Sequence, residues 1–244
     1  MQALLFTDGS VMPPRHRVGF SNTSPVLIRR FVRLVKEVYG YTISKGYFQP
    51  GKSSRLPVTA IQFPSKEIVN DLLSDAPGYR TDPFKDGSYP DARLPVSWFA
   101  LPEDQLAEVL QCAFDADGGC SLRVSRSAKK QCFELERQVF LTCWHPVLRK
   151  QYAELVNKLG ISAHVYRDRV SITGENNFRK FADNIGFSPG VMVSYKSPRW
   201  QGIEKRRLLQ LILHTYTFPY GYMQRFDART AIINDLRFRL RGIR

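Results

Sequence analysis

The chain has 244 residues, and its content of 43% hydrophobic and 24% charged residues is that of a globular protein. Collagen-like and intrinsically disordered classes are excluded, and the length suffices for one large domain or two packed halves. The balance of 36 Lys and Arg against 22 Asp and Glu gives a formal net charge of +14. Such a charge favours a polyanionic partner, above all nucleic acid, over a small neutral substrate.

Neither a membrane span nor a secretion signal is predicted. The longest apolar stretches, such as residues 208–213, are far shorter than the roughly 20 residues that cross a bilayer. The first residues do not form a basic region followed by a cleavage site. We expect a soluble intracellular protein, in the cytoplasm of a prokaryote or archaeon or in the interior of an organelle.

An internal repeat runs through the chain. Residues 3–9 (ALLFTDG) and 112–118 (CAFDADG) are both apolar runs that end in Asp-Gly. Further along, residues 25–29 (PVLIR) correspond to residues 146–150 (PVLRK), and each begins a helix-periodic run that ends at a glycine. Because a repeat decides the architecture, we predict two pseudo-symmetric halves.

Both halves show the same order of elements. After the first Asp-Gly helix and hairpin, the pattern predicts a helix from residue 25, strands over 41–48 and 58–63, and a short helix over 65–73. In the second half it predicts a helix over 103–117, hairpin strands over 120–127 and 131–142, a helix from 146, strands over 161–167 and 169–173, and a helix over 176–185. We therefore predict an α+β fold made of two αββαββα halves.

The predicted organisation has four parts. Residues 1–78 form the first half, 79–102 a linker rich in Pro, Gly and Asp, 103–200 the second half, and 201–244 a basic helical extension. The extension covers the back of the second half, extends the contact with phosphates, or does both. We favour both roles, because apolar residues recur in it at helical spacing and need a core to contact.

Each Asp-Gly run carries small residues four positions apart, Ala3 and Thr7 in the first and Cys112 and Ala116 in the second. Small residues at this spacing let two helices approach closely. If the two helices pack together, Asp8 and Asp117 lie side by side at the same end of the pair. Two adjacent carboxylates require a counter-charge, which a divalent metal supplies.

Residues 110–118 (LQCAFDADG) resemble the LAGLIDADG motif, and residues 1–9 (MQALLFTDG) resemble a divergent second copy. The chain is thus similar to single-chain, two-motif LAGLIDADG homing endonucleases of the free-standing, intron-encoded type. This resemblance implies a saddle of two four-stranded sheets with the motif helices at the interface. It also implies double-stranded DNA as the partner.

The resemblance further implies a metal site. Asp8 and Asp117 would bind Mg²⁺, or Mn²⁺, with the backbone carbonyls of Thr7 and Ala116 as supplementary ligands, and Ca²⁺ would bind without cleavage. Hydrated metal would supply the attacking hydroxide. Asp115, whose counterpart is Phe6, is expected to cap or pack rather than to catalyse.

The family also implies polar groups around each metal. A basic residue beside each metal is expected at Lys196 in the second half and at Lys85 in the first. A polar position before the second helix of each half corresponds to one of the following residues: Ser21, Asn22 or Thr23 in the first half, and Thr142 or Trp144 in the second. Trp144 departs from the usual polar type.

Strand alternation predicts which side chains face DNA. Leu122 and Val124 point to one face, and the other face is free to read bases in the major groove. The expected DNA-binding residues are Ser121, Arg123, Ser125, Glu134, Glu136 and Gln138 in the second half, and Ser10, Met12, His16, Asn22, Lys45, Tyr47 and Gln62 in the first. Arg123 suits guanine, and a glutamate can accept from cytosine N4. Phosphate contacts are expected from Lys129 and Lys130, and from Arg29, Arg30, Lys52 and Arg55.

The sequence therefore predicts a monomeric, metal-dependent DNA endonuclease that cuts both strands of a long, nearly asymmetric site and leaves short 3′ overhangs. The main alternative is a splicing maturase that binds intron RNA on the same scaffold. A DNA-binding regulator that retains only the fold is the third hypothesis. The presence of both motif acids favours the nuclease.

Overall fold

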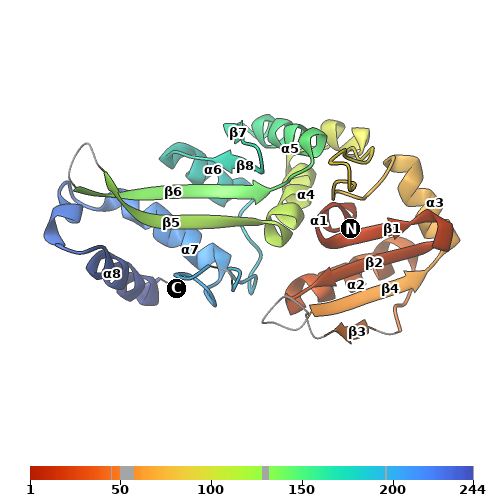
Figure 1. Ribbon diagram of the computed structural model, residues 1–244, viewed down its shortest axis with the longest axis horizontal. Coiled ribbons are helices and arrows are strands. Elements are labelled where there is room, and N and C mark those ends of the chain that lie inside the picture. The colour runs from red at the N-terminus through yellow and green to blue at the C-terminus, as the bar shows by residue number, and fades with distance from the viewer. Residues whose placement is uncertain (45, 50–57, 128–131, 196, 244) are drawn as a thin grey trace.

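The computed structural model describes residues 1–44, 46–49, 58–127, 132–195 and 197–243. The chain forms two halves that lie side by side along the longest axis of the molecule, each built on a four-stranded antiparallel sheet (Figure 1). The predicted α+β fold of two αββαββα halves is confirmed.

The first half begins with the first motif helix. Its elements are α1 (Gln2–Asp8), β1 (Gly9–Met12), the 3-10 turn η1 (Pro13–Arg15), β2 (Arg17–Asn22), α2 (Pro25–Tyr39), β3 (Gly46–Gln49), β4 (Val58–Pro64) and α3 (Lys66–Asp75). The strands lie in the order β1-β2-β4-β3. Helix α2 starts at a proline and ends at Gly40, whose φ of +64° favours glycine.

The second half repeats this order with a longer hairpin. Its elements are α4 (Glu103–Ala116), β5 (Gly118–Ser127), β6 (Cys132–Thr142), α5 (Pro146–Lys158), β7 (Ala163–Val165), β8 (Arg169–Ile172) and α6 (Glu175–Asn184), with strand order β5-β6-β8-β7. Strand β5 has 10 residues where β1 has 4, so the β5–β6 hairpin reaches far from the interface of the two halves (Figure 1).

Two strands are shorter than their sequence patterns predict. Strand β3 begins only at Gly46, and the ring of Tyr41 instead stacks on Phe63 with 4.8 Å between centroids. Strand β7 begins at Ala163, because side-chain amides of Asn177 and Asn157 accept the backbone N–H groups of Ser162 and Ala163. At Ser162 a local side-chain hydrogen bond therefore takes the place of strand pairing.

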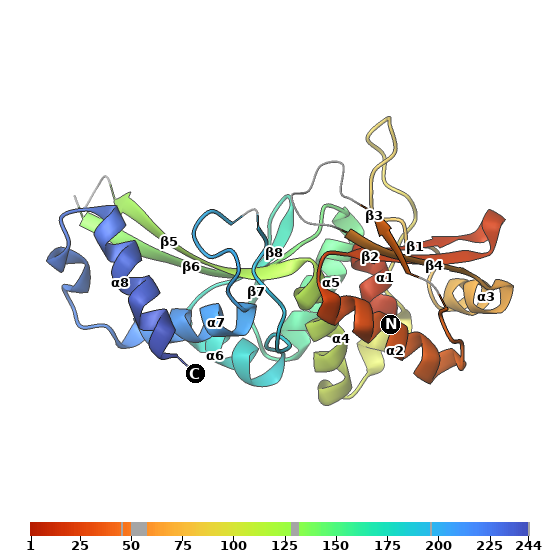
Figure 2. The ribbon, with the colours of Figure 1, turned by 90° about the horizontal axis from the view of Figure 1, so that it is seen from below.

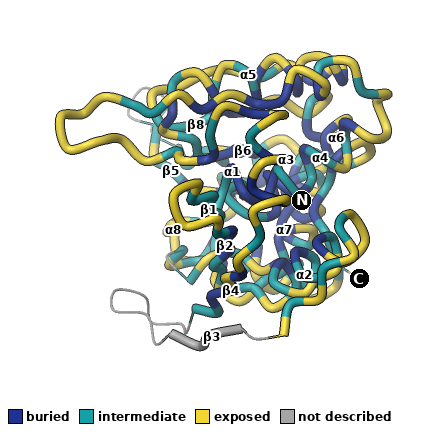
Figure 3. The backbone as a smooth tube through the Cα atoms, turned by 90° about the vertical axis from the view of Figure 1, so that its right-hand side faces the viewer, coloured by how far each residue is buried: buried dark blue, intermediate teal, exposed yellow. Residues whose placement is uncertain are grey.

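Helices α2, α3, α5, α6 and α7 lie on one side of the two sheets, whereas α8 stands beside β5 (Figure 2). Helices α1 and α4 contact each other between the halves. Buried segments gather around these two helices and α7 (Figure 3). Leu4, Leu5, Leu110 and Phe114 are fully buried there. One core thus joins both halves.

The segment between the halves and the C-terminal extension both pack on this core. Within residues 79–102, η2 (Val96–Ala100) carries Trp98, whose ring contacts Phe6 edge-on. The extension comprises α7 (Lys205–His214), η3 (Thr215–Thr217), η4 (Tyr222–Arg225) and α8 (Arg229–Gly242). Its stripe Leu208, Leu211 and Ile212 is fully buried, so the predicted core contact of the extension is confirmed. Within the described ranges, every helix is too short or too polar to cross a membrane.

Candidate active site and nucleic-acid interface

The two motif acids stand at equivalent helix ends. Asp8 is the last residue of α1, Asp117 directly follows α4, and each is followed by the glycine that starts a strand. A Cβ atom at Gly9 would lie 2.4 Å from Leu5 Cα, and one at Gly118 would lie 2.6 Å from the carbonyl oxygen of Phe114. Only glycine allows the chain to pass so close to its own helix.

Asp8 and Asp117 open into one groove. This groove has a volume of about 1080 Å³ and is lined by both halves and by the extension. Besides the two acids, its wall includes the following residues: Asn22, Ala116, Thr142, Arg123, Arg169, Arg199, Lys205 and Arg229. The structure therefore brings the two acids together at the same end of the packed helices, as the small-residue spacing predicted.

The acids share an unfavourable electrostatic environment. Burial raises the pKa of Asp117 to about 8, and the negative charge of Asp8 contributes to this rise. Burial also raises the pKa of Asp8, while a hydrogen bond from Asn22 lowers it. Two carboxylates that repel each other favour a bound cation, and their hard oxygen atoms suit Mg²⁺, Mn²⁺ or Ca²⁺. The residues present thus fit a divalent metal.

The two acids differ in their hydrogen bonds. Asn22 Nδ2 donates to Asp8 Oδ2 at 2.7 Å, and Asn22 Oδ1 accepts the backbone N–H of Ser24 at 2.7 Å. In the portion of the chain that the structure describes, no side chain donates to the carboxylate of Asp117. Asn22 is therefore the polar residue before the second helix that contacts an acid.

The position equivalent to Asn22 in the second half is Cys143. Gly9 pairs with Phe20 and Gly118 pairs with Leu141, so Asn22 and Cys143 each stand two residues beyond the paired position. The Cys143 thiol donates to the carbonyl of His145 instead of to Asp117. Of the two residues expected here, Thr142 lines the groove and Trp144 is 56% exposed.

Lys205 is a basic residue at the site that sequence reasoning missed. Its buried ammonium group donates to the carbonyls of Asp115 and Gly118, both at 2.6 Å, and to that of Phe114 at 3.2 Å. Its charge lowers the pKa of both Asp8 and Asp117. The sequence could have identified Lys205, because it follows the third helix of the second half, where the resemblance implied a basic residue.

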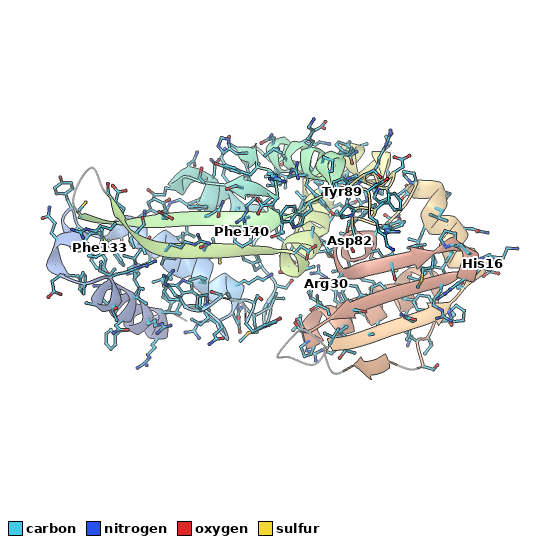
Figure 4. The ribbon with its side chains drawn as sticks, in the orientation of Figure 1. His16, Arg30, Asp82, Tyr89, Phe133 and Phe140 are labelled. Atoms are coloured by element: carbon cyan, nitrogen blue, oxygen red, sulfur yellow. The ribbon has the colours of Figure 1, made fainter. Side chains whose placement is uncertain are left out.

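The two lysines expected beside the metals have different outcomes. Lys196 lies outside the described residues, and Lys85 is exposed on the segment between the halves, outside the groove wall. Asp82 of the same segment acts on the site instead, since its negative charge raises the pKa of Asp117. Figure 4 labels Asp82 and Tyr89 where this segment passes between the halves.

The remaining motif residues have separate surroundings. Ala116 lines the groove, whereas the Thr7 hydroxyl turns back along α1 and donates to the carbonyl of Leu4 at 2.9 Å. Asp115 is buried and packs as expected, through an ion pair with Arg30 at 3.1 Å. Arg30 was expected to bind phosphate, and in the structure one of its guanidinium nitrogens contacts Asp115 and Ser188 inside the protein.

The strand register places the predicted base-reading residues of the second half on one face. Leu122 and Val124 are buried on the inner face of the sheet. The outer face carries three cross-strand pairs: Ser121 with Gln138, Arg123 with Glu136, and Ser125 with Glu134. Gln138 also donates to Ser171 Oγ on β8 at 2.7 Å. Their contacts with bases remain a prediction.

The first half presents a smaller outer face. Ser10 pairs with Gly19 and Met12 with Arg17, and Gly19 pairs in turn with Gln62, so Ser10, Met12 and Gln62 share that face. Arg17, which strand alternation did not single out, donates to Gln62 Oε1 at 3.3 Å. The backbone of Tyr47 pairs with Ala60, two residues from Gln62 on β4, so the register assigns Tyr47 to the same face as Gln62. His16 is exposed at the turn before β2. Three further predicted residues, Lys45, Lys129 and Lys130, fall outside the described residues. Figure 4 shows His16 and Phe133 at opposite ends of the molecule.

Comparison with known proteins supports this reading of the fold. Residues 104–186 match the model of the LAGLIDADG-like domain family. No curated protein matches the sequence. A solved structure of full-length DUF199/WhiA from Thermatoga maritima is similar with a TM-score of 0.50 and 12% identity, over 97% of this chain and 64% of that protein. The chain thus spans less than two thirds of that relative.

Two solved LAGLIDADG-type enzymes are also similar. The meganuclease I-AabMI bound to uncleaved DNA has a TM-score of 0.48 and 12% identity, over 96% of each chain. The homing endonuclease I-WcaI bound to its DNA recognition sequence has a TM-score of 0.47 and 13% identity, over 78% of this chain and 81% of that one.

The Asp-Gly ends of α1 and α4, the shared αββαββα order and the matched region lead to one conclusion. Residues 104–186 form a LAGLIDADG-like domain, and the first half of the chain repeats the order of elements of that region.

Proposed function

We propose that the chain is a site-specific DNA endonuclease of the homing type, which hydrolyses phosphodiesters on both strands with a divalent metal. The observation that carries this proposal is the shared groove of Asp8 and Asp117, one acid from each half. A pair of carboxylates in a groove for a polyanion weakens binding unless a cation neutralises it. The acids therefore argue for hydrolysis over binding alone.

The chain's own residues have distinct roles in this proposal. Asp8 and Asp117 would hold the metal, Mg²⁺ or Mn²⁺, with the carbonyls of Thr7 and Ala116. A metal held there would supply hydroxide by lowering the pKa of water. Asn22 orients the Asp8 carboxylate through its hydrogen bond. Lys205 holds the end of α4 and adds a positive charge beside both acids.

The outer faces of the two sheets are the proposed surface for a long, nearly asymmetric DNA target. The net charge of +14 supports phosphate binding, and the outward strand residues, with Arg123 foremost, read base edges. Because the paired acids come from opposite halves, each would serve one strand. The resemblance to homing endonucleases further suggests a monomer that leaves short 3′ overhangs. Lys196 remains proposed as a group that stabilises charge in the transition state, whereas Lys85 lies outside the groove that contains the acids.

A pool of randomised DNA duplexes tests the proposal for any target sequence. The protein selects duplexes in Ca²⁺, unbound DNA is removed, and Mg²⁺ is added before the released ends are sequenced. We expect defined double-strand ends from the native chain. Asp8→Asn and Asp117→Asn should still select duplexes but release no double-strand ends, and Asp183→Asn, an exposed acid on α6, serves as the control.

Two outcomes would overturn the assignment. Double-strand cutting by Asp117→Asn would remove that acid from the site. Tight binding of structured intron RNA, with no selection of any duplex, would favour the maturase hypothesis instead.

A further inference from the structure

The C-terminal extension completes a group of arginines in the groove. This arginine cluster comprises Arg123 on β5, Arg199 before α7, and Arg229 and Arg237 on α8. Arg237 Nη2 donates to the carbonyl of Arg199 at 2.8 Å, and Arg123, Arg199 and Arg229 line the same groove as Asp8 and Asp117. Three elements that are distant in sequence thus meet at one surface.

Among the described residues, the guanidinium groups of the cluster are not used in ion pairs, although Glu136 stands across from Arg123 in the strand register. Throughout the described ranges, no carboxylate forms an ion pair with any of its four guanidinium groups. The one carboxylate on α8, Asp235, is used by Arg239 and Tyr222. Burial, and then the positive charges of Arg229, Arg123 and Arg237, lower the pKa of Arg199. A bound anion relieves such mutual repulsion.

Buried anchors hold the elements that carry the cluster. Next to Arg199, the Trp200 indole donates to the carbonyl of Leu122 on β5 at 2.8 Å. The last turn of α8 is tied to α7 by Arg207, which donates to the carbonyls of Leu240 and Ile243. Leu236 and Leu240 of α8 are buried. The arginines are therefore presented on a fixed support.

We infer that Arg199, Arg229 and Arg237 form a clamp for the DNA phosphate backbone, on the flank of the β5–β6 hairpin. The inference rests on the proposed function, because the occupant is the duplex whose scissile phosphates lie at Asp8 and Asp117 in the same groove. Guanidinium groups suit phosphate by geometry and charge. The clamp belongs to the extension, which packs against the second half. We therefore expect the part of the DNA target that the second half covers to be bound more tightly than the part that the first half covers.

Salt dependence of binding tests the clamp. In Ca²⁺, a random-sequence duplex that covers both sheets is titrated with the native chain and with Arg229→Gln/Arg237→Gln. The slope of log K against log salt concentration should become shallower by about 1 for each phosphate that the variant no longer neutralises, and the decrease should be the same for different sequences. The charge-preserving pair Arg229→Lys/Arg237→Lys should keep a slope close to the native one.

A matched control removes equal charge on the helical side of the sheets. Arg33→Gln/Arg179→Gln replaces exposed residues of α2 and α6 that pair with Glu37 and Glu175. Equal slopes for the control and the α8 variant would overturn the clamp. A slope change with duplex RNA but not with duplex DNA would overturn it too. A native chain that binds no duplex DNA would instead contradict the proposed function.

Discussion

Arg30 of the first half and Asp115 of the second half form an ion pair with 3.1 Å between Nη1 and Oδ2. The same guanidinium nitrogen donates to Ser188 Oγ at 3.1 Å, and the backbone N–H of Ser188 donates to Asp115 Oδ1 at 3.0 Å. This network spans both halves and the segment after α6, and Asp115 stands two residues before Asp117 in the chain. It holds the motif helix that carries the acid.

Replacing Arg30 should destabilise the whole chain. The Asp115 side chain is fully buried, so Arg30→Met removes its ion-pair partner and should cost about 3 kcal/mol of unfolding free energy. Chemical denaturation measures this loss, with Arg29→Met on the exposed side of α2 as the control. The double variant Arg30→Met/Asp115→Leu should recover part of the loss. Equal stability of the Arg30 and Arg29 variants would show that the ion pair has no role.

Lys205→Met should also destabilise the fold. The substitution leaves three backbone carbonyls at the end of α4 without their donor, and a buried unsatisfied acceptor costs about 1 to 3 kcal/mol. A total loss of about 3 kcal/mol is expected by chemical denaturation. Arg206→Met, at the exposed neighbouring position, should change stability by less than about 1 kcal/mol. A Lys205 variant as stable as the Arg206 variant would contradict this role.

Stability without metal should fall as pH rises toward 8. The pKa of Asp117 is about 8 in the folded chain, against an ordinary value of 3.8 that applies to the unfolded chain. Between these two pH values the folded chain therefore binds one proton, on Asp117, that the unfolded chain has lost. The stabilisation by the protonated Asp117 carboxyl is complete below a pH of 3.8 and is lost as pH rises through about 8. Thermal melting in EDTA across this range measures it, and Asp117→Asn should flatten the profile. Mg²⁺ at a pH of about 8 should raise Tm, because the ionised acids then bind it.

Asn22→Leu should slow the cutting of one strand. Its hydrogen bond orients the Asp8 carboxylate only, and loss of such a supporting contact typically costs about 10- to 100-fold. Nicked plasmid should therefore accumulate, and strand-resolved analysis identifies the slow strand. Thr23→Val, at the exposed next position, is the control. An equal slowing of both strands would mean that Asn22 does not act through Asp8.

The order of elements and the two motif acids were readable because their signals are local. Apolar residues at helical spacing, Asp-Gly at the end of each run and period-2 alternation in β5 depend only on neighbours in the chain. For the same reason the shared outer face of Ser121, Arg123 and Ser125 followed from the sequence. The repeat then related the two halves without coordinates.

The sequence did not predict which charged side chains contact one another in the folded chain. Arg30 is 85 residues from Asp115, Lys205 is 90 from the same residue, and the arginine cluster joins β5 to the last helix. The insertion in the β5–β6 hairpin also hid the equivalence of Asn22 and Cys143, which only the strand register reveals.

The sequence by itself thus determined the two-half architecture and the identity of the paired acids, since both are encoded in short-range patterns. Only the tertiary structure decided which cations neutralise which acids and which remain available for an anion. The physical reason is that the energy of a charge depends on its burial and on the charges around it in space, which the chain brings together only by folding.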